Sequence, residues 1–172
     1  MTSNDRETLF YALDAAVMQS QGREFLGSTK VYGEWQPLTA QRFHERRKHQ
    51  AAGLLALDIG HGDHVALYME NSWDWLVADL AIQSIGAVSV PIYTTMSADS
   101  IAYILRHASV KAIFVPPSFA DATFRETVQA VASLKTVICL SSRMSIHHQA
   151  EALAGPGAEV SLTTEGLETL GA

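Results

Sequence analysis

Four short, continuous runs of apolar residues constrain the fold of this 172-residue chain more than any other feature. The runs are HVALYM, SVPIY, KAIFV and TVICL, and a stretch with helical spacing precedes each of them. A strand that is apolar without alternation is typical of a sheet that helices cover on both faces. The sequence therefore predicts an α/β fold with a mostly parallel sheet, whose strands lie at residues 65–68, 88–93, 111–115 and 136–140.

The helices between these runs begin at residues that are good N-caps, because a side-chain oxygen can accept a hydrogen bond from the first turn. Thr39 precedes an apolar stripe with helical spacing that extends to Gly60, which predicts the longest helix. The other three helices expected here, with their caps Asn71 or Ser72, Ser97 and Ser118, cover residues 72–85, 97–108 and 119–133.

The two ends of the chain give weaker patterns. We expect a short helix at 5–19 and an irregular hairpin at 24–38, and after Leu140 a helix near 147–154 followed by a frayed tail. These patterns divide the chain into an N-terminal helix and hairpin (1–36), an α/β core (37–140) and a weakly structured tail (141–172).

Composition limits the function classes. The net charge of −6 argues against nucleic-acid binding, which needs a basic surface, and 48% hydrophobic residues predict a substantial core. The lone Cys139 lies in an apolar run, so we expect a buried thiol in a reducing compartment. No signal-peptide pattern begins the sequence, and polar residues and Pro91 interrupt its longest apolar stretch. We expect a cytoplasmic protein, with contact at a membrane surface and self-association left open.

The segment with Gly60, Gly62 and Asp63 invites comparison with a phosphate-binding loop. Such a loop follows a strand and opens a helix, whereas here a helix ends and a strand begins, so a helix end and tight turn are favoured. Neither G-x-G-x-x-G nor G-x-x-x-x-G-K-[ST] occurs in the sequence.

The histidines are candidate metal ligands. Two groups stand out, His61 with His64 around Asp63, and His147 with His148, but nothing in the sequence pairs them, so surface positions are favoured over a metal site. We expect the same of the remaining helical histidines, which are His44, His49 and His107.

Basic and aromatic clusters have two interpretations each. Residues 42–49 hold four basic side chains, which could attract an anionic membrane or a phosphate, but a solvated helix face is favoured. Trp73 and Trp75 could form a ligand platform, but core packing is favoured. With no G-x-S-x-G and no histidine near Cys139 in sequence, a nucleophilic hydrolase is unsupported, and we assign no catalytic, cofactor-binding or metal residue.

Three segments between about Pro37 and Val115 form a recognisable set: AAGLLALDIGHGDHVAL ending at Leu67, AsnSer at 71 and 72 followed by Trp75, and GAVSVPIYTT at 86–95. With these segments the sequence resembles the N-terminal part of the adenylate-forming, AMP-binding enzymes, most closely the long-chain fatty acid–CoA ligases. The residues that resemble the long-chain branch are Pro91, Tyr93, Thr95, Ile101, Tyr103, Ile104 and His107.

The resemblance implies a ligase that joins a fatty acid to coenzyme A through an acyl-adenylate, using ATP and Mg²⁺. The family's phosphate loop ending in lysine, its acidic ATP-binding motifs and its C-terminal lysine domain do not appear in this sequence. We therefore expect this chain to be inactive at this length and to bind no cofactor, as a deliberately truncated enzyme, a degraded gene product or a separate piece. The alternative is a stand-alone, non-catalytic α/β module that binds a partner or a small ligand.

Overall fold

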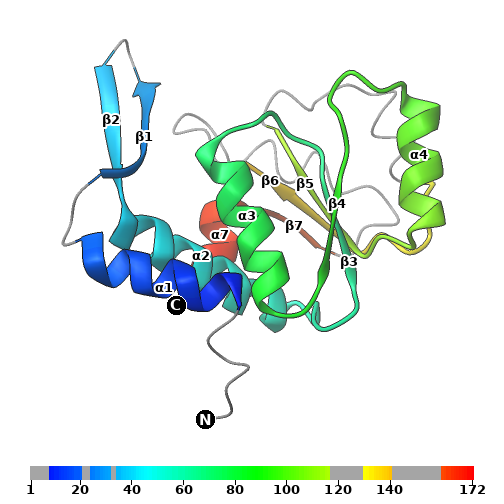
Figure 1. Cartoon of the computed structure of the whole chain (residues 1–172). Coiled ribbons are helices and arrows are strands. Elements are labelled where there is room, and N and C mark those ends of the chain that lie inside the picture. Colours follow the sequence, from blue (N-terminus) through cyan, green and yellow to red (C-terminus); the bar gives the residue numbers. More distant parts are fainter. Residues whose placement is uncertain (1–7, 21–23, 32–33, 117–129, 141–159) are drawn as a thin grey trace.

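The computed structural model describes residues 8–20, 24–31, 34–116, 130–140 and 160–172 (Figure 1). The helices are α1 (Leu9–Ser20), α2 (Ala40–Ala56), α3 (Trp73–Ser84), α4 (Ala98–His107) and α7 (Thr164–Leu170). The strands are β1 (Glu24–Val31), β2 (Glu34–Thr39), β3 (His64–Leu67), β4 (Val88–Pro91), β5 (Ala112–Val115), β6 (Thr136–Cys139) and β7 (Val160–Thr163).

Five of the strands form a parallel sheet in the order β4-β3-β5-β6-β7, and every neighbouring pair runs in the same direction. This confirms the predicted architecture, with the four predicted strands within two residues of their expected bounds. β1 and β2 form a separate antiparallel hairpin, which confirms the hairpin expected near residues 24–38.

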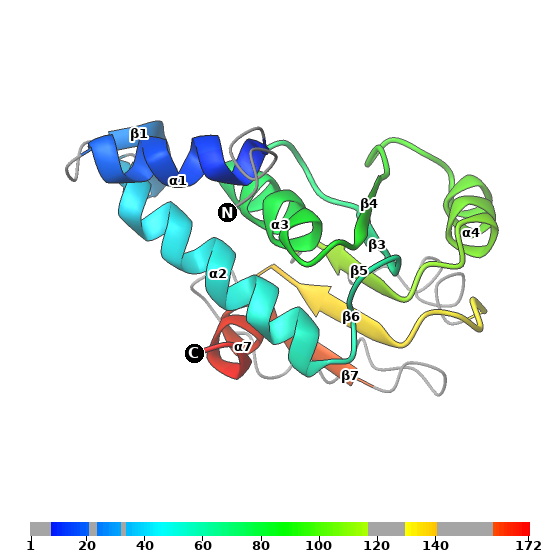
Figure 2. The ribbon, with the colours of Figure 1, turned by 60° about the horizontal axis from the view of Figure 1, so that its bottom comes forward.

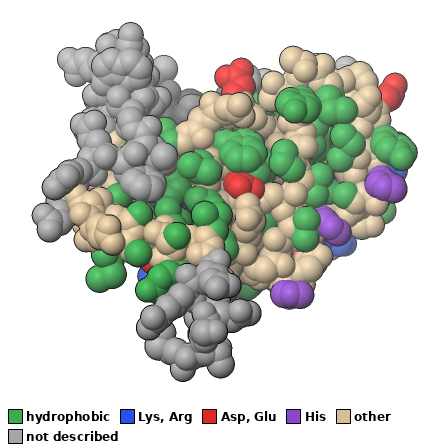
Figure 3. All heavy atoms as spheres, in the orientation of Figure 1, with side chains coloured by type: hydrophobic (Ala, Val, Ile, Leu, Met, Phe, Trp, Pro, Cys, Tyr) green, Lys and Arg blue, Asp and Glu red, His purple; other side chains and the backbone are tan. Residues whose placement is uncertain are grey.

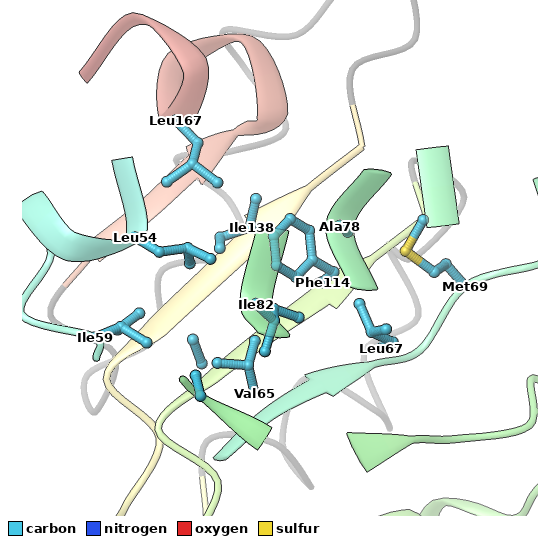
Figure 4. Packing of buried hydrophobic residues seen from close by; sticks show 12 residues of the cluster. Leu54, Ile59, Val65, Leu67, Met69, Ala78, Ile82, Phe114, Ile138 and Leu167 are labelled. Carbon is cyan, nitrogen blue, oxygen red and sulfur yellow. The ribbon is translucent and has the colours of Figure 1, made fainter. Parts of the chain in front are cut away.

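Helices cover both faces of the sheet, as Figures 1 and 2 show with α2, α3 and α7 on one side and α4 on the other. Alternate residues of each strand serve the two faces. Phe114 and Ile138 pack with Leu54 of α2, Ile82 of α3 and Leu167 of α7 in the core of Figure 4. On the opposite face, α4 packs against the strand residues that alternate with those of the first core. This second core includes Ala66, Ile113, Val115, Val137 and Cys139.

Three helices begin at the caps that the sequence predicts. Thr39 Oγ1, Ser72 Oγ and Ser97 Oγ accept hydrogen bonds from the backbone N–H groups of the first turns of α2, α3 and α4, respectively. The helix expected to reach Gly60 instead ends at Ala56, because the Leu57 N–H bonds back into the last turn and Asp58 takes a φ of 58°.

The expectation of a frayed tail is wrong for residues 160–170, which form β7 and α7. β7 completes one edge of the sheet against β6, and Leu167 of α7 is fully buried. The helix expected at 147–154 and most of the helix expected at 119–133 lie outside the described residues. Of the second helix, Ala130, Ala132 and Ser133 are described and lie in turns, so the expected helix is wrong at these residues.

Strand β4 lies at the other edge of the sheet. The N–H of Val88 donates to Asp63 O at 2.8 Å and that of Ile92 donates to Leu67 O at 3.0 Å, so both face β3. Because the direction of N–H groups alternates along a strand, Ser89 and Pro91 are the β4 residues whose nitrogens face away from the sheet. Proline has no N–H to offer there.

Candidate functional site

The strand order creates a reversal point in the sheet. The chain passes from β3 to β4 on one side, and then crosses back to β5 on the other side of β3. In open parallel α/β sheets, ligands bind outside the carboxyl ends of the strands at such a reversal. The carboxyl edge between β3 and β5 is therefore the candidate functional site.

Tyr68 organises this edge directly after β3. Its backbone N–H donates to Phe114 O at 3.0 Å, and its hydroxyl donates to Thr94 O at 3.1 Å, which ties the loop after β3 to the loop after β4. Burial raises the pKa of the Tyr68 hydroxyl above its ordinary value, so it is a hydrogen-bond donor at neutral pH. The sequence alone did not single out Tyr68, since a tyrosine ending a strand has no distinctive pattern.

The side chains exposed around Tyr68 are polar and mostly neutral. Glu70 and Asn71 follow β3, and Tyr93, Thr94 and Thr95 follow β4, with Tyr93 80% exposed. The described residues that directly follow β3, β4, β5 and β6 include no lysine or arginine. This edge can therefore donate hydrogen bonds to a ligand, but its described residues cannot neutralise a triphosphate.

The glycine segment lies at the opposite, amino edge of the sheet. Asp63 Oδ2 accepts hydrogen bonds from the Gly60 N–H at 2.8 Å and from Lys111 Nζ at 3.1 Å, and these bonds, the Gly60 bond foremost, lower the pKa of Asp63. Lys111 Nζ also donates to Asp58 O. With Gly62 at a φ of 82°, the segment is a tight turn rather than a phosphate loop, as the sequence predicts.

No group of three or more potential ligands of a metal ion comes together in the described part of the chain. His61 is exposed on the turn before β3, and His147 and His148 lie outside the described residues. The expectation that all helical histidines are surface residues is wrong for His44, whose side chain is 18% exposed and lies 3.2 Å from Asp14.

The interpretation of residues 42–49 as a solvated face is also wrong at two positions. Arg46 donates to Asp74 Oδ1 at 3.1 Å and to Glu168 Oε1 at 2.8 Å, and its guanidinium lies 4.4 Å from the ring centre of Trp73. Arg47 is 5% exposed and pairs with Asp14. These cations join helices to one another and are not available to a membrane or a phosphate.

The tryptophans and the cysteine behave as predicted. Both tryptophans are partly buried: Trp75 packs against the core around Phe114, and Trp73 packs against a smaller core made of Leu38, Phe43, Val77 and Leu80. Cys139 is 3% exposed, and burial raises the pKa of its thiol. None of the helices in the described part of the chain has an apolar stretch long enough to cross a bilayer.

One face of the molecule is rich in apolar side chains, as Figure 3 shows over α3, β4 and α4, where few lysine or arginine side chains appear. The exposed large hydrophobic residues of β4 and α4 include Val88 and Tyr103, at 44% and 62%. A face of this kind does not offer the cations that a nucleic acid needs.

A parallel sheet with this reversal defines a doubly wound α/β protein, and comparison with known proteins narrows the class. The sequence profile of the AMP-binding enzymes matches residues 13–164, so the chain belongs to the AMP-binding enzyme family. Its similarity to the A-PCP didomain of carboxylic acid reductase from Segniliparus rugosus, solved with AMP, gives a TM-score of 0.79 at 19% identity. The match covers 94% of this chain and 26% of that one, which establishes the fold.

Two of the relatives that the chain is similar to in sequence are named as a long-chain acyl-CoA ligase or synthetase. The long-chain-fatty-acid–CoA ligase FadD15 of Mycobacterium bovis is 28% identical over 108 residues, which are 63% of this chain and 18% of the relative. Long chain acyl-CoA synthetase 7, peroxisomal, of Arabidopsis thaliana is 36% identical over 90 residues, or 52% of this chain and 13% of the relative. The chain thus spans less than a quarter of the length of these two relatives.

Proposed function

We propose that this chain forms the N-terminal α/β subdomain of an adenylate-forming ligase that activates long-chain fatty acids for transfer to coenzyme A. The family match over residues 13–164 carries the proposal, and the two relatives described above supply the substrate class. In this reaction the fatty-acid carboxylate attacks the α-phosphorus of ATP and pyrophosphate leaves. The thiol of coenzyme A then attacks the acyl carbon, and AMP leaves.

The described residues support a scaffolding role within that enzyme. At the carboxyl edge the described residues contribute hydroxyl groups and Glu70 but no cation, and potential metal ligands do not converge among them. These residues do not fit a site for ATP or Mg²⁺. We therefore propose that the 172-residue chain is inactive by itself, because its sequence lacks the phosphate loop ending in a lysine that would stabilise the charge developing on a phosphate in the transition state.

A pyrophosphate-exchange assay tests the inactivity. The purified chain, incubated with ATP, Mg²⁺, palmitate and labelled pyrophosphate, is expected to give no palmitate-dependent label in ATP. A full-length long-chain ligase under the same conditions serves as the positive control. Exchange above the no-palmitate background would contradict the assignment of this chain as a scaffold without a nucleotide site.

A chimera tests the ligase assignment independently. Residues 13–164 replace the matching segment of a related long-chain fatty acid–CoA ligase, and the expected result is a folded protein that forms palmitoyl-CoA. A second chimera carrying a segment from an unrelated doubly wound protein is the matched control. If the first chimera melts cooperatively yet has no more activity than the control, the proposed function is wrong.

A further inference from the structure

Strands β1 and β2 form a small sheet that stands apart from the parallel sheet. Among the described strands each pairs only with the other, in an antiparallel register that runs from Ser28↔Pro37 to Val31↔Glu34. Figures 1 and 2 show this hairpin at the N-terminal end of α2, away from the strands β3 to β7. A two-stranded hairpin alone is at best marginally stable in water, and further strands or a packed helix are needed to make it stable.

The outer edges of the hairpin offer backbone groups for further pairing. Each strand of an antiparallel pair directs some of its N–H and C=O groups to its partner and the others away from it. No described strand accepts or donates to the groups of β1 and β2 that point away. β1 contains no proline, whereas β2 lacks an N–H at Pro37, so β1 has the more complete edge. An edge of this kind is a template for another strand.

Helix α1, which precedes the hairpin, has apolar residues on two sides. Its only charged residue, Asp14, faces α2, where Arg47 Nη2 donates to it at 3.0 Å. Phe10 and Leu13 pack inward against the small core of α2 and α3. Tyr11 and Met18 lie two turns apart, and so on one side of the helix, and are 47% and 84% exposed. A helix that is apolar all round is typical of one that is covered on more than one side.

The outward side of α1 and the hairpin belong to one surface. Three residues separate the end of α1 at Ser20 from the start of β1 at Glu24, and Figures 1 and 2 show the hairpin at that end of α1. We call the hairpin β1–β2 together with Tyr11 and Met18 the N-terminal surface. It combines strand edges that can pair with an exposed apolar stripe that carries no charge.

The chemistry of this surface and the length of the relatives favour another part of the same polypeptide as its cover. A helix that lies on a membrane surface carries lysine or arginine on its polar face, and α1 has neither. The two ligases described above are several times longer than the matched segment, which covers 18% and 13% of them. Likewise, the structural match covers 94% of this chain but 26% of the reductase didomain. A protein of this architecture therefore has a long remainder that can reach the surface.

We propose that the N-terminal surface docks a second β-sheet, whose further strands come from the part of the ligase polypeptide that follows this segment. The inference rests on the proposed function, which makes this chain one part of a longer ligase. An additional strand pairs with the hairpin through backbone hydrogen bonds, and apolar side chains of the second sheet cover Tyr11 and Met18. The chain thus contributes five strands to one sheet and two to another.

Hydrogen exchange of the backbone amides tests the docking surface in two proteins. One is the 172-residue chain, and the other is a chimera in which residues 9–172 replace the matching segment of a related long-chain fatty acid–CoA ligase. In the isolated chain, residues 24–31 and 34–39 are expected to exchange much faster than those of β3 and β5, which are paired in both proteins. In the chimera, new hydrogen bonds are expected to slow exchange of the hairpin by about tenfold or more.

Two substitutions at Met18 test the apolar part of the surface. Met18→Lys places a charge where the second sheet covers the helix, so it is expected to reduce the slowing of exchange in the chimera. In the isolated chain, where Met18 is exposed, the same substitution is expected to change little. Met18→Leu is the matched control, and it is expected to keep the slowing because it remains apolar.

The outcomes separate this inference from the proposed function. A chimera that forms palmitoyl-CoA while its hairpin exchanges as fast as in the isolated chain would overturn the docking surface and leave the proposed function standing. Slowed exchange in a chimera without activity would support the docking surface and count against the ligase assignment.

The isolated chain gives a second test that needs no chimera. Fast exchange of the hairpin that depends neither on protein concentration nor on vesicles of phosphatidylcholine and phosphatidylglycerol supports the proposal. Exchange as slow as that of β3 would overturn it. Slowing with rising concentration would instead identify a second copy of the chain as the occupant, and slowing on addition of the vesicles would identify a lipid surface, so either result would also overturn it.

Discussion

Replacing Gly53 by alanine raises the helix propensity of α2 but introduces a steric clash with α7. Gly53 lies in α2 where α7 crosses it, and an added Cβ would overlap the carbonyl oxygen of Leu167 and lie 2.8 Å from Leu167 Cδ1. At an exposed helix position the same change stabilises by about 1 kcal/mol. Here, because the obstacle is the backbone of α7, that helix has to shift away from α2.

The cost can be estimated from the contacts that the shift disturbs. Overpacking costs about 1–3 kcal/mol. Glu168 of α7 accepts hydrogen bonds from Arg46 Nε and Gln50 Nε2, both at 2.8 Å, and losing a hydrogen bond to a charged group costs about 1.5–3 kcal/mol. After the propensity gain is subtracted, overpacking leaves about 1 kcal/mol, and weakening of the Glu168 hydrogen bonds brings the expected fall in the free energy of unfolding to about 2 kcal/mol.

Urea unfolding followed by tryptophan fluorescence measures this change, because Trp73 lies against Arg46 in the same helix contact. With a typical slope, the midpoint is expected to drop by about 1 M urea. Gly60→Ala is the matched control, since a Cβ there meets only Leu55 Cδ2 at 3.9 Å, and its midpoint should be almost unchanged. A Gly53→Ala protein as stable as the natural sequence would refute the close contact between α2 and α7.

Two further predictions concern titration and chemical reactivity. The pKa of Asp63 is lowered by its hydrogen bonds, so the stability that Asp63 contributes is present above the ordinary pKa of 3.8 and is lost as the pH falls through the lowered pKa. We expect Asp63→Asn to reduce the fall in urea midpoint between pH 5 and pH 2. An unchanged fall would count against the hydrogen-bonded turn at Gly60–Asp63. The thiol of Cys139 is buried and its pKa is raised, so it should react with Ellman's reagent far more slowly in the folded protein than in 6 M guanidinium chloride, and equal rates would contradict its burial.

The sheet was predictable because each strand has a distinctive local pattern. Ile113 and Phe114 lie next to each other in a fully apolar run yet serve opposite faces of the sheet, as a strand covered on both sides requires. The caps Ser72 and Ser97 were equally predictable, because a hydroxyl residue just before a helical stretch commonly caps the helix N-terminus. Local patterns of this kind need no knowledge of the rest of the chain.

The ion pairs could not be predicted, since they depend on which helices meet. Arg46 is separated in sequence from both its partners, Asp74 and Glu168, and a run of charges on one helix looks the same whether it is solvated or paired. The C-terminal helix does have a sequence signal: Leu167 and Leu170 are three residues apart, and Gly171 follows as a helix end. The seven-residue length of α7 explains why that signal is weak.

Pro91 makes the two edges of the sheet unequal in their capacity to pair with an additional strand. Within the four residues of β4, only the Ser89 N–H could donate to an additional strand on the outer side. β7 pairs with β6 on one side and has no proline among residues 160–163. Backbone hydrogen bonding to a further strand is therefore favoured along β7 and opposed along β4. Any assembly that extends this sheet, whether with more of the same polypeptide or with another molecule, would add strands from the β7 side.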